Sequence, residues 1–231
     1  MDVVYHAGDR EAVALRDAQR KARLLFDEIG ARLIRPGISE EQLSEAIRSL
    51  AHERFGIETH WHKRIVRAGP HTMLTFIEEP PDRALAADDI AFIDLGPVFE
   101  AWEADFGATF VLGDDPAKHR IRDALQPVFD AVKGYFQSQP DITGDQLYAA
   151  AHRFAGEAGF TFGGTIAGHV VGAFPHERIP DDRVTLYITR GNHRPIRSVN
   201  ADGRPRHWIL EIHLVDRERQ IGAFFEDLLT A

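Results

Sequence analysis

The stretch IAFIDLGPVFEAWEADFGATFVL, residues 90–112, decides the fold. It contains two apolar runs that join near Glu100 and Ala101, and this pattern is typical of two antiparallel strands. Each run carries an acid in an apolar context, Asp94 in the first and Asp105 in the second. A turn centred just before Glu100 places Asp94 directly opposite Asp105, with Cβ atoms about 4.5–5.5 Å apart on one face of the sheet.

Two facing carboxylates in a half-buried sheet repel each other, and this repulsion raises the pKa of one of them. A cation between the carboxylates removes the difficulty, and oxygen ligands suit Mg, Mn, Fe or Zn. The alternative is that both acids are solvated on the outer face of the hairpin. The hairpin alone leaves the metal-site interpretation and the solvated interpretation open.

The composition indicates an ordinary globular chain that forms one domain over residues 1–231, with 44% apolar and 27% charged residues. The net charge of −9 argues against nucleic-acid binding, and no apolar run approaches the length of a membrane span. The N-terminus lacks the features of a signal peptide, so we expect a cytoplasmic location. Because the chain contains no cysteine, any metal ion must be held by His, Asp and Glu.

Helical segments flank the hairpin on both sides. Residues 10–34 and 116–137 show apolar side chains at helical spacing. Each of these segments is followed by a capping box that begins a second helix, at Ser39 in the first case and at Thr143 in the second. The order helix, helix, strands therefore occurs twice along the chain.

The repeated segments also match in their residues. LRDAQ at 15–19 corresponds to IRDAL at 121–125 with an offset of 106, and the capping-box segments SEEQL and TGDQL match with an offset of 104. Chance similarity between amphipathic helices is the alternative, and two collinear matches argue against it. We therefore expect an α+β fold of two halves, residues 9–112 and 116–231, related by a pseudo-twofold. A site between the halves would draw ligands from both.

The second half carries further candidate ligands. His169 and His176 lie in a loop, residues 168–180, that glycine and proline punctuate, which is a poor place for core histidines. A lone histidine is usually a satisfied polar residue, but two in one such loop favour a functional role. Near the C-terminus Glu211 and Glu226 each lie in an apolar, strand-like run.

The order and spacing of these residues resemble the metallopeptidases of the pita-bread fold, which include methionine aminopeptidase, aminopeptidase P, prolidase and creatinase. Four features carry the resemblance: Asp94 with Asp105 eleven residues on, the GH…G…HE.P pattern of residues 168–180, Glu211 in an apolar strand, and Glu226 followed by Asp227. The likeness covers nearly the whole chain from the first helix onward. It implies a pita-bread fold, with the two halves arranged around a curved antiparallel sheet.

The resemblance also implies a site for two divalent metal ions, Mn, Fe, Co or Zn. Asp94 would bind one ion, and Asp105 and Glu226 would bridge both ions. His169 and Glu211 would complete the ligand set of the other ion. A water activated by the two ions would then attack the scissile carbonyl.

The resemblance assigns catalytic roles as well. His176 matches the family histidine that stabilises the oxyanion, and Glu211 matches the glutamate that acts as general base. The family has another active-site histidine shortly before its first aspartate, where this chain has none. His71 lies slightly upstream and is the expected substitute, with His62 and His60 as alternatives that would line the pocket.

The expected activity is metal-dependent hydrolysis of small peptides, of the aminopeptidase or Xaa-Pro dipeptidase type, with a small peptide as partner. One alternative is a creatinase-like hydrolase that breaks a C–N bond in a small metabolite without metal. Another is a non-catalytic pita-bread module that binds peptides or proteins. All five ligand positions retain ligand-competent residues, which disfavours both. Ile212 stands where the peptidases usually have proline, which leaves the substrate open, and homodimer formation is also left open.

Overall fold

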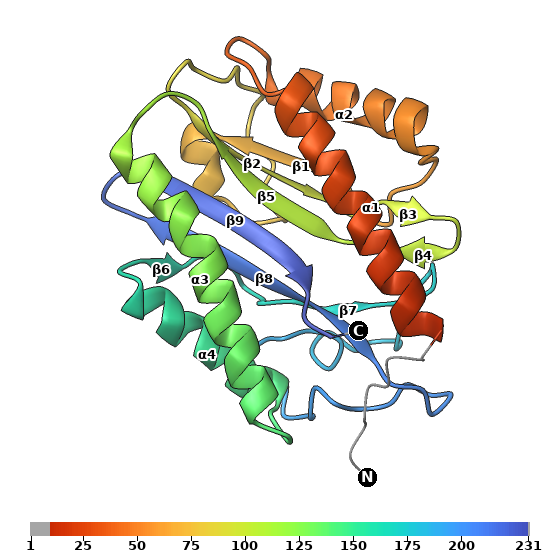
Figure 1. Ribbon diagram of the computed structural model, residues 1–231. Helices are drawn as coiled ribbons and strands as arrows, with labels where there is room; N and C mark the ends of the chain where they lie inside the picture. The colour runs from red at the N-terminus through yellow and green to blue at the C-terminus, as the bar shows by residue number, and fades with distance from the viewer. Residues whose placement is uncertain (1–9, 231) are drawn as a thin grey trace.

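The computed structural model describes residues 10–230 (Figure 1). Its helices are α1 (Arg10–Arg32), α2 (Glu40–Phe55), the 3-10 helix η1 (Gly69–Met73), α3 (Pro116–Ser138) and α4 (Gly144–Glu157). The strands of the main sheet are β1 (Ile65–Ala68), β2 (Ile90–Leu95), β5 (Phe106–Val111), β6 (Thr161–Phe162), β7 (Val170–Val171), β8 (His207–Asp216) and β9 (Ile221–Leu228). A separate two-stranded ribbon consists of β3 (Val98–Phe99) and β4 (Trp102–Glu103).

The main sheet is antiparallel, and its strand order reflects the repeat in the sequence. The order is β1-β2-β5-β9-β8-β6, with β7 paired to β8 off this path. Three strands from the first part of the chain thus meet three strands from the second part in reversed order. A twofold axis between β5 and β9 would produce this arrangement. The expected α+β architecture around an antiparallel sheet is confirmed.

Helices α1 and α3 cross the same face of the sheet, and each lies over the strands of its own part of the chain (Figure 1). Two large hydrophobic clusters form beneath the helices. One cluster joins α1 and α2 to the first strands and includes Leu25, Leu43 and Ile93. The other joins α3 and α4 to the last strands and includes Leu125, Leu147, Leu210 and Ile212.

The helix starts follow from local side-chain chemistry. Ser39 caps α2 by accepting a hydrogen bond from the Gln42 backbone N–H, and the Ser39 backbone N–H donates to Gln42 Oε1. Thr143 and Gln146 form the same reciprocal pair at α4. Both predicted capping boxes are confirmed. Within residues 10–230, none of the helices combines the length and apolar character that crossing a bilayer requires.

The hairpin register differs from the prediction, because Asp94 faces Gly107 and not Asp105. Phe99 pairs with Trp102, so the turn between them consists of Glu100 and Ala101. Glu100 has a positive φ of 59°. Centring the turn between these two residues shifts the register by two positions. Because side chains alternate between faces with a period of two, such a shift keeps both acids on one face.

Candidate metal centre

Four adjacent strands place a row of acids across the sheet. Asp94 on β2 pairs with Gly107 on β5, Gly107 pairs with Glu226 on β9, and Glu226 pairs with Glu211 on β8. Gly107 has no side chain, and a Cβ there would clash with the Phe224 ring and crowd the Glu226 side chain. On β2 the neighbours Ile93 and Leu95 pack into the helix-side cluster, so Asp94 points to the opposite face.

Asp105 joins the row from the residue just before β5 and is only 2% exposed. Its backbone has no ladder partner of its own, and the buried amide of Gln19 on α1 takes that place. The Gln19 Nε2 donates to the Asp105 carbonyl oxygen at 2.6 Å, and the Asp105 N–H donates to Gln19 Oε1 at 3.2 Å. This two-point contact imitates a neighbouring strand and fixes the position of the carboxylate.

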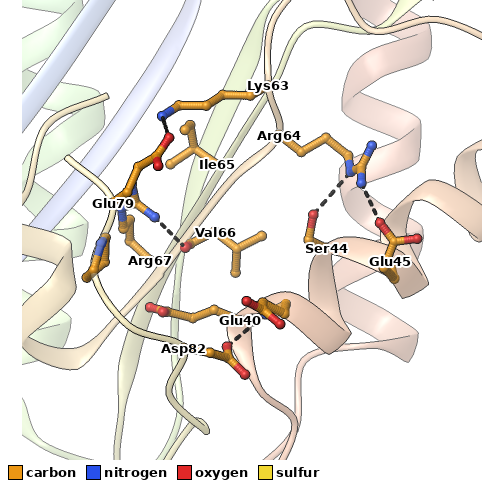
Figure 2. A pocket seen from close by; sticks show the side chains of 12 residues that line it. Glu40, Ser44, Glu45, Lys63, Arg64, Ile65, Val66, Arg67, Glu79 and Asp82 are labelled. Atoms are coloured by element: carbon orange, nitrogen blue, oxygen red, sulfur yellow. Dashed lines mark hydrogen bonds and ion pairs between the residues drawn. The ribbon is translucent and has the colours of Figure 1, made fainter. Parts of the chain in front are cut away.

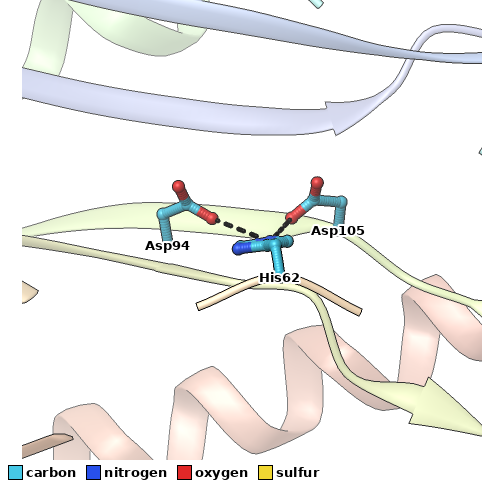
Figure 3. Close-up of side chains that lie close together, drawn as sticks. All are labelled: His62, Asp94 and Asp105. Atoms are coloured by element: carbon cyan, nitrogen blue, oxygen red, sulfur yellow. Dashed lines mark hydrogen bonds and ion pairs between the residues drawn. The ribbon is translucent and has the colours of Figure 1, made fainter. Parts of the chain in front are cut away.

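Two imidazoles contact the carboxylates. His169 Nε2 lies 2.9 Å from Asp105 Oδ2 and 3.6 Å from Glu211 Oε1. His62 Nε2 lies 3.1 Å from Asp105 Oδ1 and 3.4 Å from Asp94 Oδ1 (Figure 3). Each oxygen of the Asp105 carboxylate therefore faces a different imidazole.

A glycine allows the His169 loop to approach the sheet. Gly168 has a φ of 141°, a conformation that L side chains rarely adopt. A Cβ on this residue would also lie far inside van der Waals distance of the Ile209 carbonyl oxygen on β8. The close approach lets the Ile209 N–H donate to the His169 carbonyl oxygen at 2.9 Å, which anchors the residue that carries the imidazole.

We expect Gly168→Ala to displace His169 and to destabilise the fold. Both the steric clash and the unfavourable φ oppose the added methyl group, so the free energy of unfolding should fall by about 2–4 kcal/mol. Urea denaturation of the metal-free protein measures this loss. Gly134→Ala on α3 is the matched control, because a Cβ there meets nothing within 4 Å. Equal stability of the two variants would contradict the packing described for Gly168.

Burial dominates the electrostatics of three carboxyl groups. It raises the pKa of Glu211 to about 8 and that of Asp94 to about 6, although nearby imidazoles partly oppose both shifts. Burial also raises the pKa of Glu226 well above its ordinary value, and the charges of Asp105 and Asp94 add to the shift. Bringing these acids together is thus unfavourable for their ionised forms unless positive charge compensates them.

The histidines and Asp105 shift in the opposite sense. Burial alone would lower the pKa of His62, but the charges of Asp105 and Asp94 outweigh it and raise that pKa to about 10. Burial likewise disfavours the charged form of His169, but the hydrogen bond and charge of Asp105 raise its pKa to about 9. Burial would raise the pKa of Asp105, yet His62 and His169 hold it well below its usual range.

We expect the metal-free protein to lose stability as the pH rises from about 7 to 9. The pKa of Glu211 is raised from 4.5 to about 8, and those of His62 and His169 from 6.5 to about 10 and 9. The folded chain therefore holds these protons more tightly than the unfolded chain. The stabilisation is complete below the ordinary pKa and is lost as the pH passes through the raised one.

Thermal denaturation with a chelator present, at intervals across this pH range, measures the effect. Asp105 contributes with the opposite sign only below its ordinary pKa of 3.8, and His60, whose pKa burial lowers to about 4, opposes the loss only below its ordinary pKa of 6.5. A midpoint that rises steadily between pH 7 and 9 would contradict the charge distribution described for the cluster.

The donor set fits divalent cations. Glu226 Oε1 and Asp94 Oδ1 are buried without a hydrogen-bond partner among the described residues. Buried carboxylate oxygens are normally paired. Asp94 Oδ1 faces the His62 ring at 3.4 Å, so Glu226 Oε1 is the atom that indicates room for a further positive charge. Two groups of residues each bring their ligand atoms within 4.8 Å of one another: His62, Asp94 and Asp105 in one group, and Asp105, His169 and Glu226 in the other. Asp105 belongs to both, as a bridging ligand would.

His176 lies at the rim of the cluster and is held by a buried acid. Its Nδ1 lies 2.8 Å from Glu103 Oε2, and its backbone N–H donates to Glu103 Oε1 at 3.0 Å. Glu103 is 1% exposed and also accepts from the Gly172 N–H at 3.2 Å. The ring is thereby fixed through one nitrogen, which leaves Nε2 for a group in the cavity.

The cluster lines a cavity of about 520 Å³. Its walls contain Trp61, Leu74, Phe76, Ile166, Ile179 and Tyr187, together with the acids and histidines described above. His213, on the same face of β8 as Glu211, also lines the cavity and bonds through Nε2 to the Thr72 carbonyl oxygen at 2.8 Å. An apolar cavity with a few convergent polar groups is the usual form of a small-molecule site.

His71 does not line this cavity, which corrects its expected role as the additional active-site histidine. Its Nδ1 lies 2.9 Å from Glu40 Oε2 at the start of α2, and the same carboxylate accepts from the Ala68 N–H on β1. Glu40 in turn borders a separate cavity of about 380 Å³, where Lys63 pairs with Glu79 and Arg64 with Glu45 (Figure 2). His71 thus ties helix α2 to the sheet.

Three residues of the site escape prediction from the sequence pattern. His62, considered only as an alternative, approaches Asp94 and Asp105, although it comes from the segment before β1. A sequence pattern could have pointed to Gln19, because it is the polar residue on the buried face of α1. Glu103 could have been noticed because it lies two residues before Asp105 in the stretch that carries the acids.

The chain matches a known protein family over most of its length. The model of metallopeptidase family M24 matches residues 13–228. Methionine aminopeptidase 2 of Bacillus subtilis is 30% identical over 96 residues, which are 41% of this chain and 38% of that protein. The chain thus spans well under half of this curated relative.

Solved structures resemble the chain over almost its whole length. A dipeptidase, PepE, from Mycobacterium ulcerans has 26% identity and a TM-score of 0.74, covering 99% of this chain and 56% of that one. The X-Pro aminopeptidase of Thermotoga maritima has 20% identity and a TM-score of 0.75, covering 100% and 63%. Methionine aminopeptidase of Rickettsia prowazekii has 14% identity and a TM-score of 0.70, covering 99% and 100%. These likenesses confirm the pita-bread fold, and with the family match they establish that the chain belongs to metallopeptidase family M24.

Proposed function

We propose that the protein hydrolyses short peptides with the aid of two divalent metal ions. One observation carries the proposal: buried acids and imidazoles from both parts of the chain converge at a cavity of about 520 Å³, with Glu226 Oε1 buried and without a hydrogen-bond partner among residues 10–230. Isolated buried carboxylates are costly, so an arrangement of this kind needs a compensating charge.

Five residues would hold the ions, as the resemblance implied: Asp94, Asp105, His169, Glu211 and Glu226. Asp105 suits a bridging role because its two oxygens face different imidazoles. Divalent ions held here would polarise the scissile carbonyl and lower the pKa of an attacking water. Mn, Fe, Co and Zn are all compatible with a set of carboxylate and imidazole ligands.

The residues of the chain would handle protons and charge. Glu211 lines the cavity, and the positive charge of bound ions would favour its ionised form, in which it would take a proton from the attacking water and return it to the leaving amine. His176 is fixed through Nδ1 by Glu103, and in its imidazolium form, with Glu103 as the counter-charge, it would present an Nε2–H to the cavity as a donor to the developing oxyanion. The apolar walls would hold the substrate side chains and exclude water.

An aminopeptidase or Xaa-Pro dipeptidase activity is the specific form that we propose. The structural neighbours named above include a dipeptidase, an X-Pro aminopeptidase and a methionine aminopeptidase. The cavity has room for a few residues and not for a long folded chain. A small peptide is therefore the proposed partner.

A panel of peptides incubated with the Mn²⁺-loaded protein tests this function. The panel contains Xaa-Pro dipeptides, other dipeptides and longer peptides with free or acetylated N-termini, and released amino acids are quantified. We expect metal-dependent cleavage of short peptides, abolished by a chelator and restored by metal. Cleavage of a small C–N metabolite by the chelated protein would favour the creatinase-like alternative. Metal-free peptide binding without turnover would favour the non-catalytic module.

A further inference from the structure

We propose that His62 is a sixth metal ligand, which completes the ion position formed by Asp94 and Asp105. The inference rests on the proposed two-metal centre and adds a residue that the family resemblance did not include among the ligands. Three independent observations support it: the distances from the ring to the carboxylates, the hydrogen bond of the second ring nitrogen, and the space reserved for the ring.

The His62 ring lies at similar distances from two carboxylates as the His169 ring does. His62 approaches Asp94 and Asp105, and His169 approaches Asp105 and Glu211. The His62 Nε2 lies 3.1 Å from one carboxylate oxygen and 3.4 Å from another, against 2.9 and 3.6 Å for His169. Ligand bonds to such metals are about 2.0–2.2 Å long, so neighbouring ligand atoms of one ion are about 3 Å apart. Figure 3 shows the ring between the two carboxylates, with Nε2 toward both.

The other ring nitrogen makes the contact expected of a metal ligand. His62 Nδ1 lies 2.7 Å from the carbonyl oxygen of Lys63, the next residue in the chain. His169 Nδ1 makes the same contact with the carbonyl oxygen of Val170 at 2.8 Å. Because a carbonyl only accepts, each Nδ1 carries a proton, and in the neutral ring Nε2 is left with its lone pair for a metal.

The surroundings hold the His62 ring in place. Its side chain is only 8% exposed, and Trp61 packs edge-on against it with centroids 4.4 Å apart. The Trp61 ring also contacts the His169 ring, at 5.1 Å, so one aromatic side chain braces both imidazoles. A Cβ at residue 96 would clash with the His62 ring, so Gly96 provides the space that the ring occupies.

Other roles for His62 predict a different change in metal affinity when the residue is removed. If His62 were only a cation that neutralises the acids, it would compete with the metal, and its removal would leave the metal affinity unchanged or raised. If it faced the substrate, its removal would lower turnover and leave the metal affinity unchanged. A ligand is the role for which removal weakens metal binding.

The test is a calorimetric titration of the full chain with Co²⁺. We expect two ions per wild-type chain. In His62→Ala we expect one site to persist and the other to weaken by at least about 10-fold. His62→Gln, which retains volume and polarity, replaces the alanine variant if that variant fails to fold by circular dichroism. His71→Gln is the matched control and should bind two ions as the wild type does.

Visible absorption of the bound Co²⁺ gives a second readout that is independent of turnover. Loss of an imidazole nitrogen should change the spectrum of one ion in the His62 variants and of neither ion in His71→Gln. Two sites of unchanged or raised affinity in the His62 variants would overturn the inference while leaving the two-metal centre intact. A wild-type chain that binds no Co²⁺ would instead overturn the proposed function.

Discussion

Asp105→Asn is expected to abolish peptide hydrolysis and to leave at most one weakly bound metal ion. The Asp105 carboxylate is the group whose two oxygens face different imidazoles, so its charge serves both proposed ion positions. The amide of asparagine has the same shape but no charge, and its nitrogen cannot act as a ligand in place of an oxygen. We expect kcat/KM to fall by at least about 10³-fold, because metal ions contribute several kcal/mol to such reactions.

The fold should survive this change. The Gln19 side chain holds the backbone of Asp105, so the asparagine remains in place even though its bonds to the imidazoles weaken. Circular dichroism and metal analysis of the purified, reconstituted variant separate loss of the ions from loss of the fold. Asp130→Asn on the exposed face of α3 is the matched control and should retain both ions and full turnover. Wild-type activity in Asp105→Asn would falsify the bridging assignment.

His176→Ala should lower kcat by about 10²–10³-fold while KM stays within a few-fold of its original value. A donor aimed at a developing oxyanion acts on the transition state and contributes little to substrate binding. Among the described residues the His176 ring pairs with the Glu103 carboxylate, which does not belong to the proposed ligand set. Metal content should therefore stay unchanged.

Steady-state kinetics with metal analysis on the same preparation measure this prediction. His152→Ala on the exposed surface of α4 is the control for the loss of an imidazole. A loss of metal in the His176 variant would make this residue a ligand, and an unchanged kcat would leave it as a loop histidine without a chemical task. Glu103→Gln should reduce kcat in the same direction, because the amide holds the ring less firmly than the carboxylate.

The sequence predicted the elements of this fold well where local chemistry decides them. The capping boxes at Ser39 and Thr143, the strand that carries Asp94 and the strand that begins just after Asp105 all follow from short-range patterns. The internal repeat in the helices predicted that the order helix, helix, strands occurs twice, and the structure has this order. Sequence-based prediction of the register failed because moving a turn by one residue moves the pairing by two, and apolar patterning cannot detect a shift that preserves the faces.

In the candidate site, too, residues in local patterns could be predicted, and residues placed by contacts between distant segments could not. Strand acids could be identified because an ionisable residue in an apolar run is conspicuous, as for Glu211. His62 and Glu103 could not be placed, because their contacts with Asp105 and His176 depend on how separate segments cross in space. His71 was chosen on its distance along the chain from Asp94. Distance along the chain does not determine where a side chain points, and in the structure the His71 ring contacts Glu40.

A crystal structure of the Mn²⁺-loaded protein, with anomalous diffraction recorded at a wavelength where manganese scatters strongly, tests the central claim most directly. The account predicts two anomalous peaks in the cavity, on either side of the Asp105 carboxylate. One peak should contact Asp94 and His62, the other should contact His169 and Glu211, and Glu226 should reach both. The absence of any anomalous peak among these residues, in crystals saturated with Mn²⁺, would contradict the account.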